Sequence, residues 1–187
     1  MTTPKPTSKE LLLALRRKYP DTAVLAEVTM DDEQELDRAR AAEVLLYPSR
    51  RKQYEEKGLF CDAELPDDYS PYHAITRRRI DALIFETKHR TAVEIKVSRA
   101  DFFRDTEAKR SAWMRHTHRF AYLVPKGLVK IEEVPDGCGL WEYENGVITI
   151  TKRAKINKEA QEFPTAMTKY FAWRAFAAER KLESKRR

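Results

Sequence analysis

Two acidic residues and a lysine lie within two apolar segments, where a buried strand ordinarily carries no charge. Asp81 interrupts the run Ile80–Phe85, and Glu94 and Lys96 interrupt the run Ala92–Val97. A short polar segment separates the two runs, a pattern that predicts a β-hairpin. Glu94 and Lys96 are two residues apart, so in a strand their side chains point to the same face.

The length of the connecting loop determines which residues face each other. If the loop is Glu86–His89, Phe85 faces Arg90, and counting back along both strands places Asp81 opposite Glu94. Directly opposed Cβ atoms lie about 4.5–5.5 Å apart, so the two carboxylates repel each other and resist desolvation. A divalent cation between them removes this conflict, and hard oxygen ligands suit Mg²⁺ or Mn²⁺. The hairpin is therefore predicted to form a metal site.

A metal held by Asp81 and Glu94 would be suited to phosphodiester hydrolysis. It lowers the pKa of a bound water and neutralises charge on phosphate oxygens. The ammonium group of Lys96 could orient the attacking water or stabilise the developing charge. The alternative is a simple ion pair between Glu94 and Lys96 on a half-exposed strand, but the opposed Asp81 favours the metal site.

The composition fits one domain, residues 1–187, that acts on a polyanion. The chain has 36 Lys and Arg against 30 Asp and Glu, a net charge of +6, which favours a partner such as DNA. It has no apolar run of membrane-spanning length, no signal-peptide pattern and no C-x-x-C. We therefore expect a reduced cytoplasmic setting and no membrane partner. The five glycines form no P-loop or dinucleotide motif.

Periodicity and turn residues predict the order of the elements around the hairpin. A segment covering 31–70 is an insertion between the first and second core strands, and 164–187 forms a C-terminal helix and basic tail. The predicted elements are a helix at Lys9–Tyr19 capped by Ser8, a strand at Thr22–Met30, a helix at Asp31–Leu46, a helix from Arg99 to about His116 capped by Ser98, a strand at Arg119–Pro125, a short helical or irregular crossing at Leu128–Pro135, a hairpin of Gly139–Glu144 and Val147–Lys152 around Asn145-Gly146, and a helix from Thr165 to about Leu182.

This order of helix, three strands, helix and strand resembles the PD-(D/E)xK nuclease superfamily. Asp81 stands where the superfamily has its first acid, and Glu94-Ile95-Lys96 matches its E-x-K triplet. Over roughly Ser8–Thr151 the sequence is also similar to the MmcB-like DNA-repair branch of bacteria and phages. This resemblance implies the cytoplasm of a bacterium or of a phage-infected host. The similar segments are A-E-V-T-M, R-R-R-I-D-A-L, V-E-I-K-V-S-R-A-D-F, R-F-A-Y-L-V-P-K-G-L and E-V-P-D-G-C-G-L-W. Ile80 replaces the proline that precedes the first acid in the family pattern.

The resemblance implies an α/β fold with a restriction-endonuclease-like αβββαβ core, a mixed sheet flanked by helices, to which a β-hairpin and a C-terminal helix are added. It implies a Mg²⁺- or Mn²⁺-dependent deoxyribonuclease of DNA repair, recombination or phage DNA processing. The catalytic residues would be Asp81, Glu94 and Lys96, with the backbone carbonyl of Ile95 as a further metal ligand. A third acid would be Glu10 or Glu27, and Glu27 lies in the segment of better resemblance. The alternative function is an inactive DNA-binding or recruitment module of the same fold.

Several basic residues are candidates for nucleic-acid binding, each with a structural alternative. Arg79 could grip phosphates or balance nearby acids, and a basic helix face is more often simply solvated. The candidates are Arg77, Arg79, Lys109, Arg110, Arg115 and His118.

The last helix and the insertion also allow two interpretations each. The helix is rich in aromatic residues, which could pack one face onto the sheet or stack on unpaired bases. Homodimerisation through its remaining surface is a further alternative. The aromatic residues of this last helix are Tyr170, Phe171, Trp173 and Phe176. The insertion, in turn, could form a basic flap over DNA or a solvated amphipathic helix.

Overall fold

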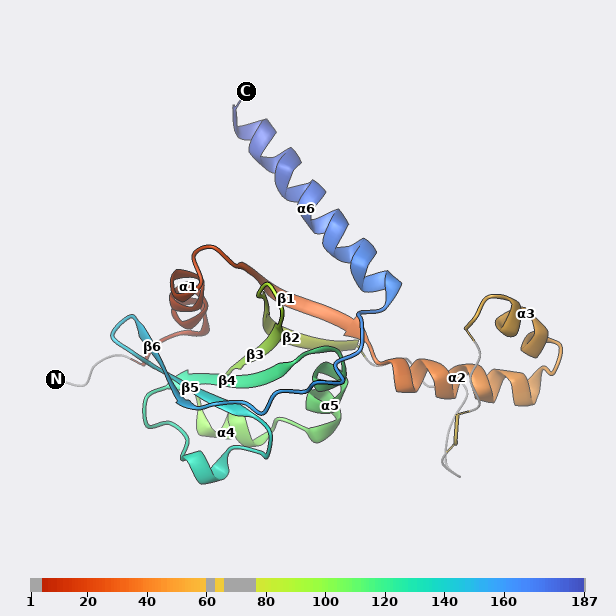
Figure 1. Ribbon diagram of the computed structural model, residues 1–187, viewed down its shortest axis with the longest axis horizontal. Coiled ribbons are helices and arrows are strands. Elements are labelled where there is room, and N and C mark those ends of the chain that lie inside the picture. The colour runs from red at the N-terminus through yellow and green to blue at the C-terminus, as the bar shows by residue number, and fades with distance from the viewer. Residues whose placement is uncertain (1–4, 60–62, 66–76, 187) are drawn as a thin grey trace.

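The predicted hairpin lies within a six-stranded mixed sheet that has helices on both faces (Figure 1). The computed structural model describes residues 5–59, 63–65 and 77–186. The strands follow the order β1-β2-β3-β4-β5-β6; β3–β4 and β4–β5 are parallel pairs and the other neighbours are antiparallel. The predicted α/β class is confirmed. The strands are β1 (Ala23–Asp31), β2 (Arg77–Phe85), β3 (Arg90–Ile95), β4 (Arg119–Pro125), β5 (Gly139–Glu144) and β6 (Val147–Lys152).

The register of the β2–β3 hairpin is the one that the sequence predicts. Phe85 pairs with Arg90 and Ala82 with Val93. The backbone N–H of Glu86 donates to the carbonyl of His89 at 2.9 Å and closes the expected loop. This register puts Asp81 and Glu94 at opposing positions, directly beyond the last residues of the ladder.

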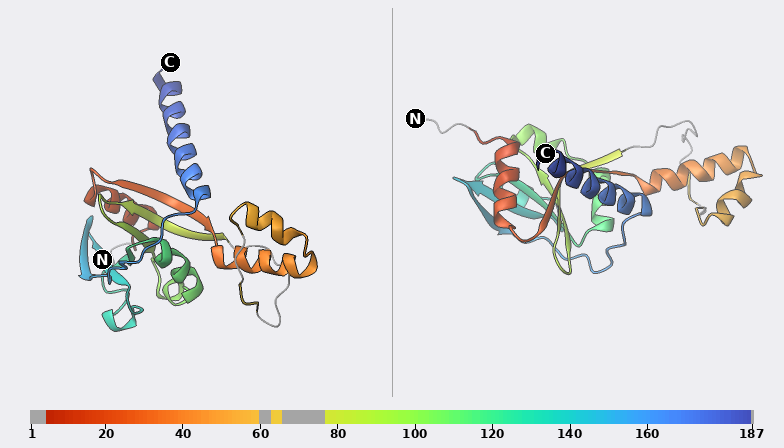
Figure 2. Two further views of the ribbon diagram at one scale, coloured as in Figure 1. Left: turned by 45° about the vertical axis from the view of Figure 1, so that its right-hand side comes forward. Right: turned by 90° about the horizontal axis from the view of Figure 1, so that it is seen from above.

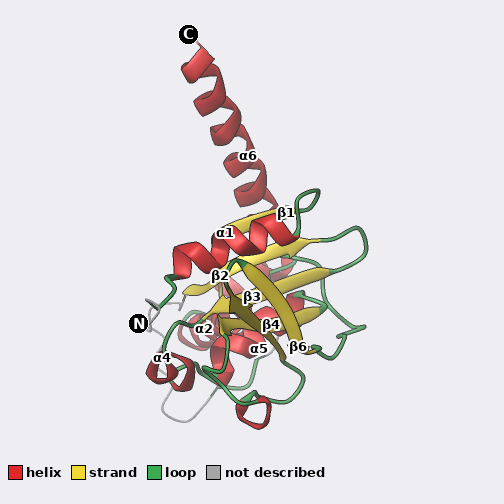
Figure 3. Ribbon diagram, turned by 90° about the vertical axis from the view of Figure 1, so that its left-hand side faces the viewer, coloured by secondary structure: helices red, strands yellow, loops and turns green. Residues whose placement is uncertain are grey.

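Each face of the sheet carries its own hydrophobic core. Helix α1 (Ser8–Lys18) covers one face, where Leu11 and Leu15 are fully buried (Figure 3). Helices α4 (Arg99–Phe103) and α5 (Glu107–His116) cover the other face, where Phe102 and Trp113 join the core. Side chains alternate between faces along a strand, and Ala92 lies on the α4/α5 side. Glu94 therefore also belongs to that side.

Two predicted helix boundaries differ in the structure. The single helix expected at Arg99–His116 is divided into α4 and α5, because Thr106 caps a new helix by accepting a hydrogen bond from the Lys109 N–H at 3.3 Å. Ser98 caps α4 as expected, accepting from the Asp101 N–H at 3.2 Å. The cap of α1 is Thr7 rather than Ser8, since Thr7 forms a reciprocal capping box with Glu10.

The described part of the insertion contains two helices that extend from one end of the sheet (Figure 2). Helix α2 (Glu33–Leu46) is the predicted one, and α3 (Arg50–Glu56) occupies the basic segment for which no element was predicted. Arg78 of β2 ties the start of α2 to the sheet through an ion pair of 2.9 Å with Asp32. The turn-rich connector expected at 66–71 lies outside the described residues.

The C-terminal part follows the prediction closely. A short 3-10 helix, η1 (Ile131–Glu133), occupies the expected crossing. Asn145 and Gly146 both have positive φ, +49° and +88°, as the tight hairpin turn between β5 and β6 requires. Helix α6 (Thr165–Arg186) starts against the sheet and then extends away from it (Figures 1 and 2). Among the described residues, no helix has the length and apolar character to cross a bilayer.

Candidate functional site

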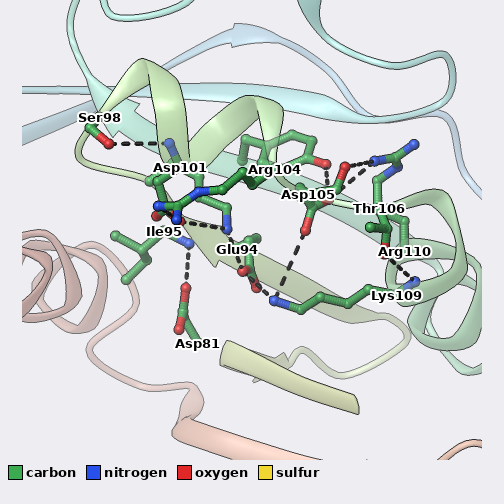
Figure 4. Close-up of polar contacts among 12 residues, drawn as sticks. Asp81, Glu94, Ile95, Ser98, Asp101, Arg104, Asp105, Thr106, Lys109 and Arg110 are labelled. Carbon is green, nitrogen blue, oxygen red and sulfur yellow. Dashed lines mark hydrogen bonds and ion pairs between the residues drawn. The ribbon is translucent and has the colours of Figure 1, made fainter. Parts of the chain in front are cut away.

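The two strands of the hairpin separate at Asp81, and the side chain of Asp81 takes over the missing backbone contact. The last paired residues are Ala82 and Val93. Beyond them, a carboxylate oxygen of Asp81 accepts the backbone N–H of Ile95 at 2.8 Å (Figure 4). In a continued ladder this N–H would bind the backbone of β2. The Asp81 carboxylate is thus held between the strands, next to Glu94.

Glu27 continues the same row of acids onto β1. It lies opposite Asp81 because the pairs on both sides of it are in one unbroken register. Its φ is +48°, a left-handed conformation that costs a residue with a side chain about 1–2 kcal/mol. The side chain is exposed. The flanking pairs are Ala26 with Ala82 and Val28 with Ile80.

The alternation of side chains along β2 reverses at Asp81. Ile80 and Leu83 belong to the core on the α4/α5 side, although they are three residues apart. Arg77 and Arg79 therefore do not follow Asp81 in the regular alternation that would put them on its face. Arg77 pairs with Asp31 at 3.4 Å on the surface.

Glu94 is a buried carboxylate with two ammonium groups on one oxygen. Its exposed fraction is 2%. Lys96 Nζ lies 3.0 Å from Oε1, and Lys109 Nζ binds the same atom. The other oxygen, Oε2, is buried and has no hydrogen-bond partner among the described residues. Burial and the charge of Asp81 raise the pKa of Glu94 despite Lys109 and Lys96. The carboxylate therefore keeps an unsatisfied position next to a second acid.

Lys96 is held in a charged, partly enclosed position. Burial lowers the pKa of Lys96, but the charges of Glu94, Asp101 and Asp105 outweigh it, so the pKa is raised overall. Asp101 lies 3.7 Å from Lys96 Nζ. The lysine is thus fully protonated at neutral pH and can donate hydrogen bonds, but it cannot accept a proton as a base.

Lys109 and Arg110, two of the candidates for nucleic-acid binding, both contact acids of the site. Lys109 reaches Glu94 and lies 4.0 Å from Asp105, and Arg110 binds Asp105 at 3.2 Å. The Tyr122 hydroxyl donates to Asp105 at 2.5 Å, and burial together with this contact raises the pKa of Tyr122. The break between α4 and α5 places Asp105 here, and this break was not predicted because the two helices form one pattern in the sequence.

Three of the predicted residues lie away from the carboxylate row. His118 directly precedes β4 and lies level with Arg90, not Glu94: its backbone N–H donates to the Arg90 carbonyl at 2.9 Å, and its Nδ1 accepts the Arg90 N–H at 3.1 Å. Arg115 is in the last turn of α5. Glu10 is on the helix that covers the opposite face and is engaged by Thr7. Of the two candidates for a third acid, only Glu27 is in the row.

The residues of the row fit a divalent cation. A cation between Asp81 and Oε2 of Glu94 would satisfy the buried oxygen and relieve the repulsion that raises the Glu94 pKa. The Ile95 carbonyl is directed toward β2 as well, because in a strand the N–H and C=O of one residue lie on the same side. Among the described residues, no group of three or more acidic, histidine or cysteine side chains is arranged to hold a metal without movement.

A separate cavity of about 810 Å³ lies at the C-terminal end of β1, beside Thr29–Asp31. It is bounded by α2, Gly58–Leu59 and the start of α6, and it contains neither the Asp81–Glu94 pair nor Lys96. Its charged residues have both signs, among them Asp31, Asp37 and Arg40. The cavity is therefore distinct from the carboxylate row.

The fold and site define an α/β protein with a row of acids across three strands of a helix-flanked sheet. No family model matches the chain, and no curated protein matches it. Among solved structures, it is similar to a protein of unknown function from Silicibacter pomeroyi, with 25% identity and a TM-score of 0.44, over 58% of this chain and 70% of that one. At this TM-score the similarity carries no argument about function.

Proposed function

We propose that the protein is a metal-dependent nuclease that hydrolyses DNA phosphodiester bonds, in DNA repair, recombination or phage DNA processing. The observation that carries the proposal is the buried Glu94 carboxylate, which has Lys96 on one oxygen and, within the described part of the chain, no hydrogen-bond partner on the other. Two acids and a protonated lysine at the end of one hairpin are the groups that phosphodiester hydrolysis needs.

Asp81 and Glu94 would hold the metal, with the Ile95 carbonyl as a further oxygen ligand. A bound Mg²⁺ or Mn²⁺ supplies an acidified water and charge neutralisation at the phosphate. Lys96 is protonated and rigidly placed, so it donates hydrogen bonds to a non-bridging phosphate oxygen and stabilises charge in the transition state. Lys109 Nζ, which binds Glu94 and lies 4.0 Å from Asp105, would keep Asp105 as a partner if a metal were held at the Glu94 carboxylate.

The second candidate function is a DNA-binding or recruitment module of the same shape that does not cut. The observation in its favour is that Asp81 and Glu94, the two acids of the hairpin, already have a backbone donor or basic partners. Asp81 accepts the Ile95 N–H, and Glu94 has two ammonium groups. A module of this kind would bind DNA in a salt-dependent way without any stabilisation by Mn²⁺.

Cleavage of a panel of DNA structures with Mg²⁺ and Mn²⁺ tests the proposal. The panel includes single strands, flaps, junctions and duplexes, and wild type is compared with Lys96→Ala. We expect cleavage by wild type and its loss in Lys96→Ala, by at least about a hundredfold, as for removal of one transition-state donor. Lys88→Ala is the matched control, because Lys88 is exposed in the loop at the far end of the hairpin. Equal cleavage by wild type and Lys96→Ala refutes the mechanism.

A further inference from the structure

Only the first part of helix α6 packs against the core of the sheet, and the rest of the helix is exposed. Met167 is buried, and Phe171 meets Phe85 edge-on with ring centroids 5.3 Å apart. From Ala178 to Lys185 every side chain is exposed. Figures 1 and 2 show this C-terminal half of the helix standing clear of the sheet and of the other helices.

The helix leaves the sheet beside the row of acids. Arg174 donates from NH1 to the backbone carbonyl of Ala26 at 2.8 Å, and its guanidinium lies 5.6 Å from the centre of the Tyr170 ring. Ala26 is the residue before Glu27, which stands opposite Asp81. A partner bound along the free half of α6 would therefore pass close to the candidate site.

The surface of α6 that faces away from the sheet carries two exposed aromatic rings. Trp173 and Phe176 are 66% and 55% exposed, and a spacing of three makes them neighbours on the helix. Arg180 lies over the Phe176 ring at 5.8 Å, and Lys169 is one turn before Trp173. Flat rings flanked by cations are the groups that stack on bases and contact phosphates.

The charge of the helix discriminates between the partners that an exposed aromatic surface could take. Residues 165–186 contain six Lys and Arg and two Glu, a net charge of +4. Two copies of the helix side by side would repel each other. A membrane surface requires the charges to be confined to one side, whereas here the helical spacing distributes them around the axis. A polyanionic partner complements the positive charge of the helix, and unpaired bases can stack on its aromatic rings.

We propose that α6 binds single-stranded nucleic acid, with Trp173 and Phe176 stacking on unpaired bases and Lys169 and Arg180 contacting phosphates. This inference rests on the proposed function in taking nucleic acid as the substrate, and it specifies a single-stranded segment next to the site. Duplex ends, flaps and gaps all offer such a segment.

Tryptophan fluorescence of the full chain tests the inference directly. The chain has three tryptophans, and Trp113 and Trp141 are buried, at 0% and 5% exposure. Oligodeoxythymidylate of about 16 nucleotides, the upper site size of common single-strand-binding surfaces, is added in EDTA so that no cleavage occurs. We expect quenching in wild type. In Trp173→Phe the quenching is lost but the affinity is kept, because the phenyl ring still stacks.

Paired substitutions separate the aromatic and the electrostatic contributions. Trp173→Ala with Phe176→Ala should weaken binding by at least about tenfold, since stacking contributes about 1–3 kcal/mol per base. Leu45→Ala with Leu46→Ala is the control, because it removes two exposed apolar side chains from α2. Lys169→Gln with Arg180→Gln should lower the salt slope of log K by about 1.4, at about 0.7 per phosphate contact on a single strand. Arg16→Gln with Arg17→Gln, exposed on α1, is the charge control.

Three results would overturn the inference. The double alanine variant could bind as tightly as wild type, a duplex of equal length could bind and quench as well as the single strand, or Trp173 could become protected by self-association without any oligonucleotide. These failures are distinct from a failure of the proposed function. Binding is measured without metal, so a chain that never cuts DNA but shows Trp173 quenching by the single strand supports the role of α6 alone.

Discussion

Replacing Glu94 with glutamine should leave the cation-free protein at least as stable as the wild type. The pKa of Glu94 is raised by burial and by Asp81, so the folded protein favours the neutral form of this side chain. Glutamine has the shape of that neutral form, and its amide can donate to Asp81 from the position of the unsatisfied oxygen. The two lysines keep partners, because Lys96 retains Asp101 at 3.7 Å and Lys109 retains Asp105 at 4.0 Å.

A divalent cation should reverse the order of the two melting temperatures. Mn²⁺ at about 100 times its dissociation constant stabilises a single-site protein by about 2.7 kcal/mol. For a chain of 187 residues, about 2–4 °C per kcal/mol makes this a rise of about 5–11 °C for wild type. Glu94→Gln has lost one of the two carboxylates, so its melting temperature should move little. Calorimetry in EDTA and in Mn²⁺ measures all four values.

The control for this experiment is Glu132→Gln, which neutralises an exposed glutamate of η1. It should follow wild type in both conditions. The reasoning is refuted if Glu94→Gln melts clearly below wild type in EDTA, because the buried carboxylate would then be a stabilising partner of the lysines. An equal rise with Mn²⁺ in both proteins would place the cation at another site.

Two further predictions concern the same row of acids. Glu27→Gly should melt about 2–8 °C above Glu27→Ala in calorimetry, because glycine adopts a φ of +48° without the penalty of about 1–2 kcal/mol that a Cβ brings. Equal melting temperatures would contradict the strain. Acidification should abolish the stabilisation by Mn²⁺ as the pH falls through the raised pKa of Glu94, starting above the ordinary value of 4.5. Without metal the dependence on pH is opposite. Between the ordinary pKa of 4.5 and the raised pKa of Glu94, the folded state binds more protons than the unfolded state, so stability falls as the pH rises. Melting temperatures measured against pH in EDTA and in Mn²⁺ check the two dependences.

The sequence predicted the hairpin and its register because local patterns determine both. Two apolar runs and a four-residue loop allow one pairing that buries one set of side chains, and the structure pairs Phe85 with Arg90 accordingly. The strand at Arg119–Pro125 and the Asn145-Gly146 turn were predictable for the same reason. The cap of α1 was less predictable, because Thr7 and Ser8 are adjacent and either could serve. The cap of α5 was missed because one helix was predicted across α4 and α5.

The surroundings of Glu94 could not be predicted, because they depend on contacts between distant segments. Lys109 reaches the carboxylate only because the chain breaks after α4 and restarts at Thr106. The conformation of Glu27 has no local signal either, since a glutamate rarely adopts positive φ. Its place opposite Asp81 is set by the register of β1 and β2, which the long insertion between them conceals in the sequence.

The charges around the candidate site connect its stability to its proposed chemistry. Glu94, Asp101 and Asp105 pair there with four basic side chains, and Asp81 adjoins them through the Ile95 N–H. When these four carboxylates are ionised, the eight groups have a formal charge of zero without metal, the exposed Glu27 not being counted. A neutral cluster has no net attraction for a phosphate, whereas one divalent cation makes it positive and a polyanion is then attracted. Metal binding would thus precede productive contact with DNA at the site. Helix α6 retains its net charge of +4 in either state, so it can hold nucleic acid beside the site before the metal arrives. The residues of this cluster are Asp81, Glu94, Asp101 and Asp105 with Lys96, Arg104, Lys109 and Arg110.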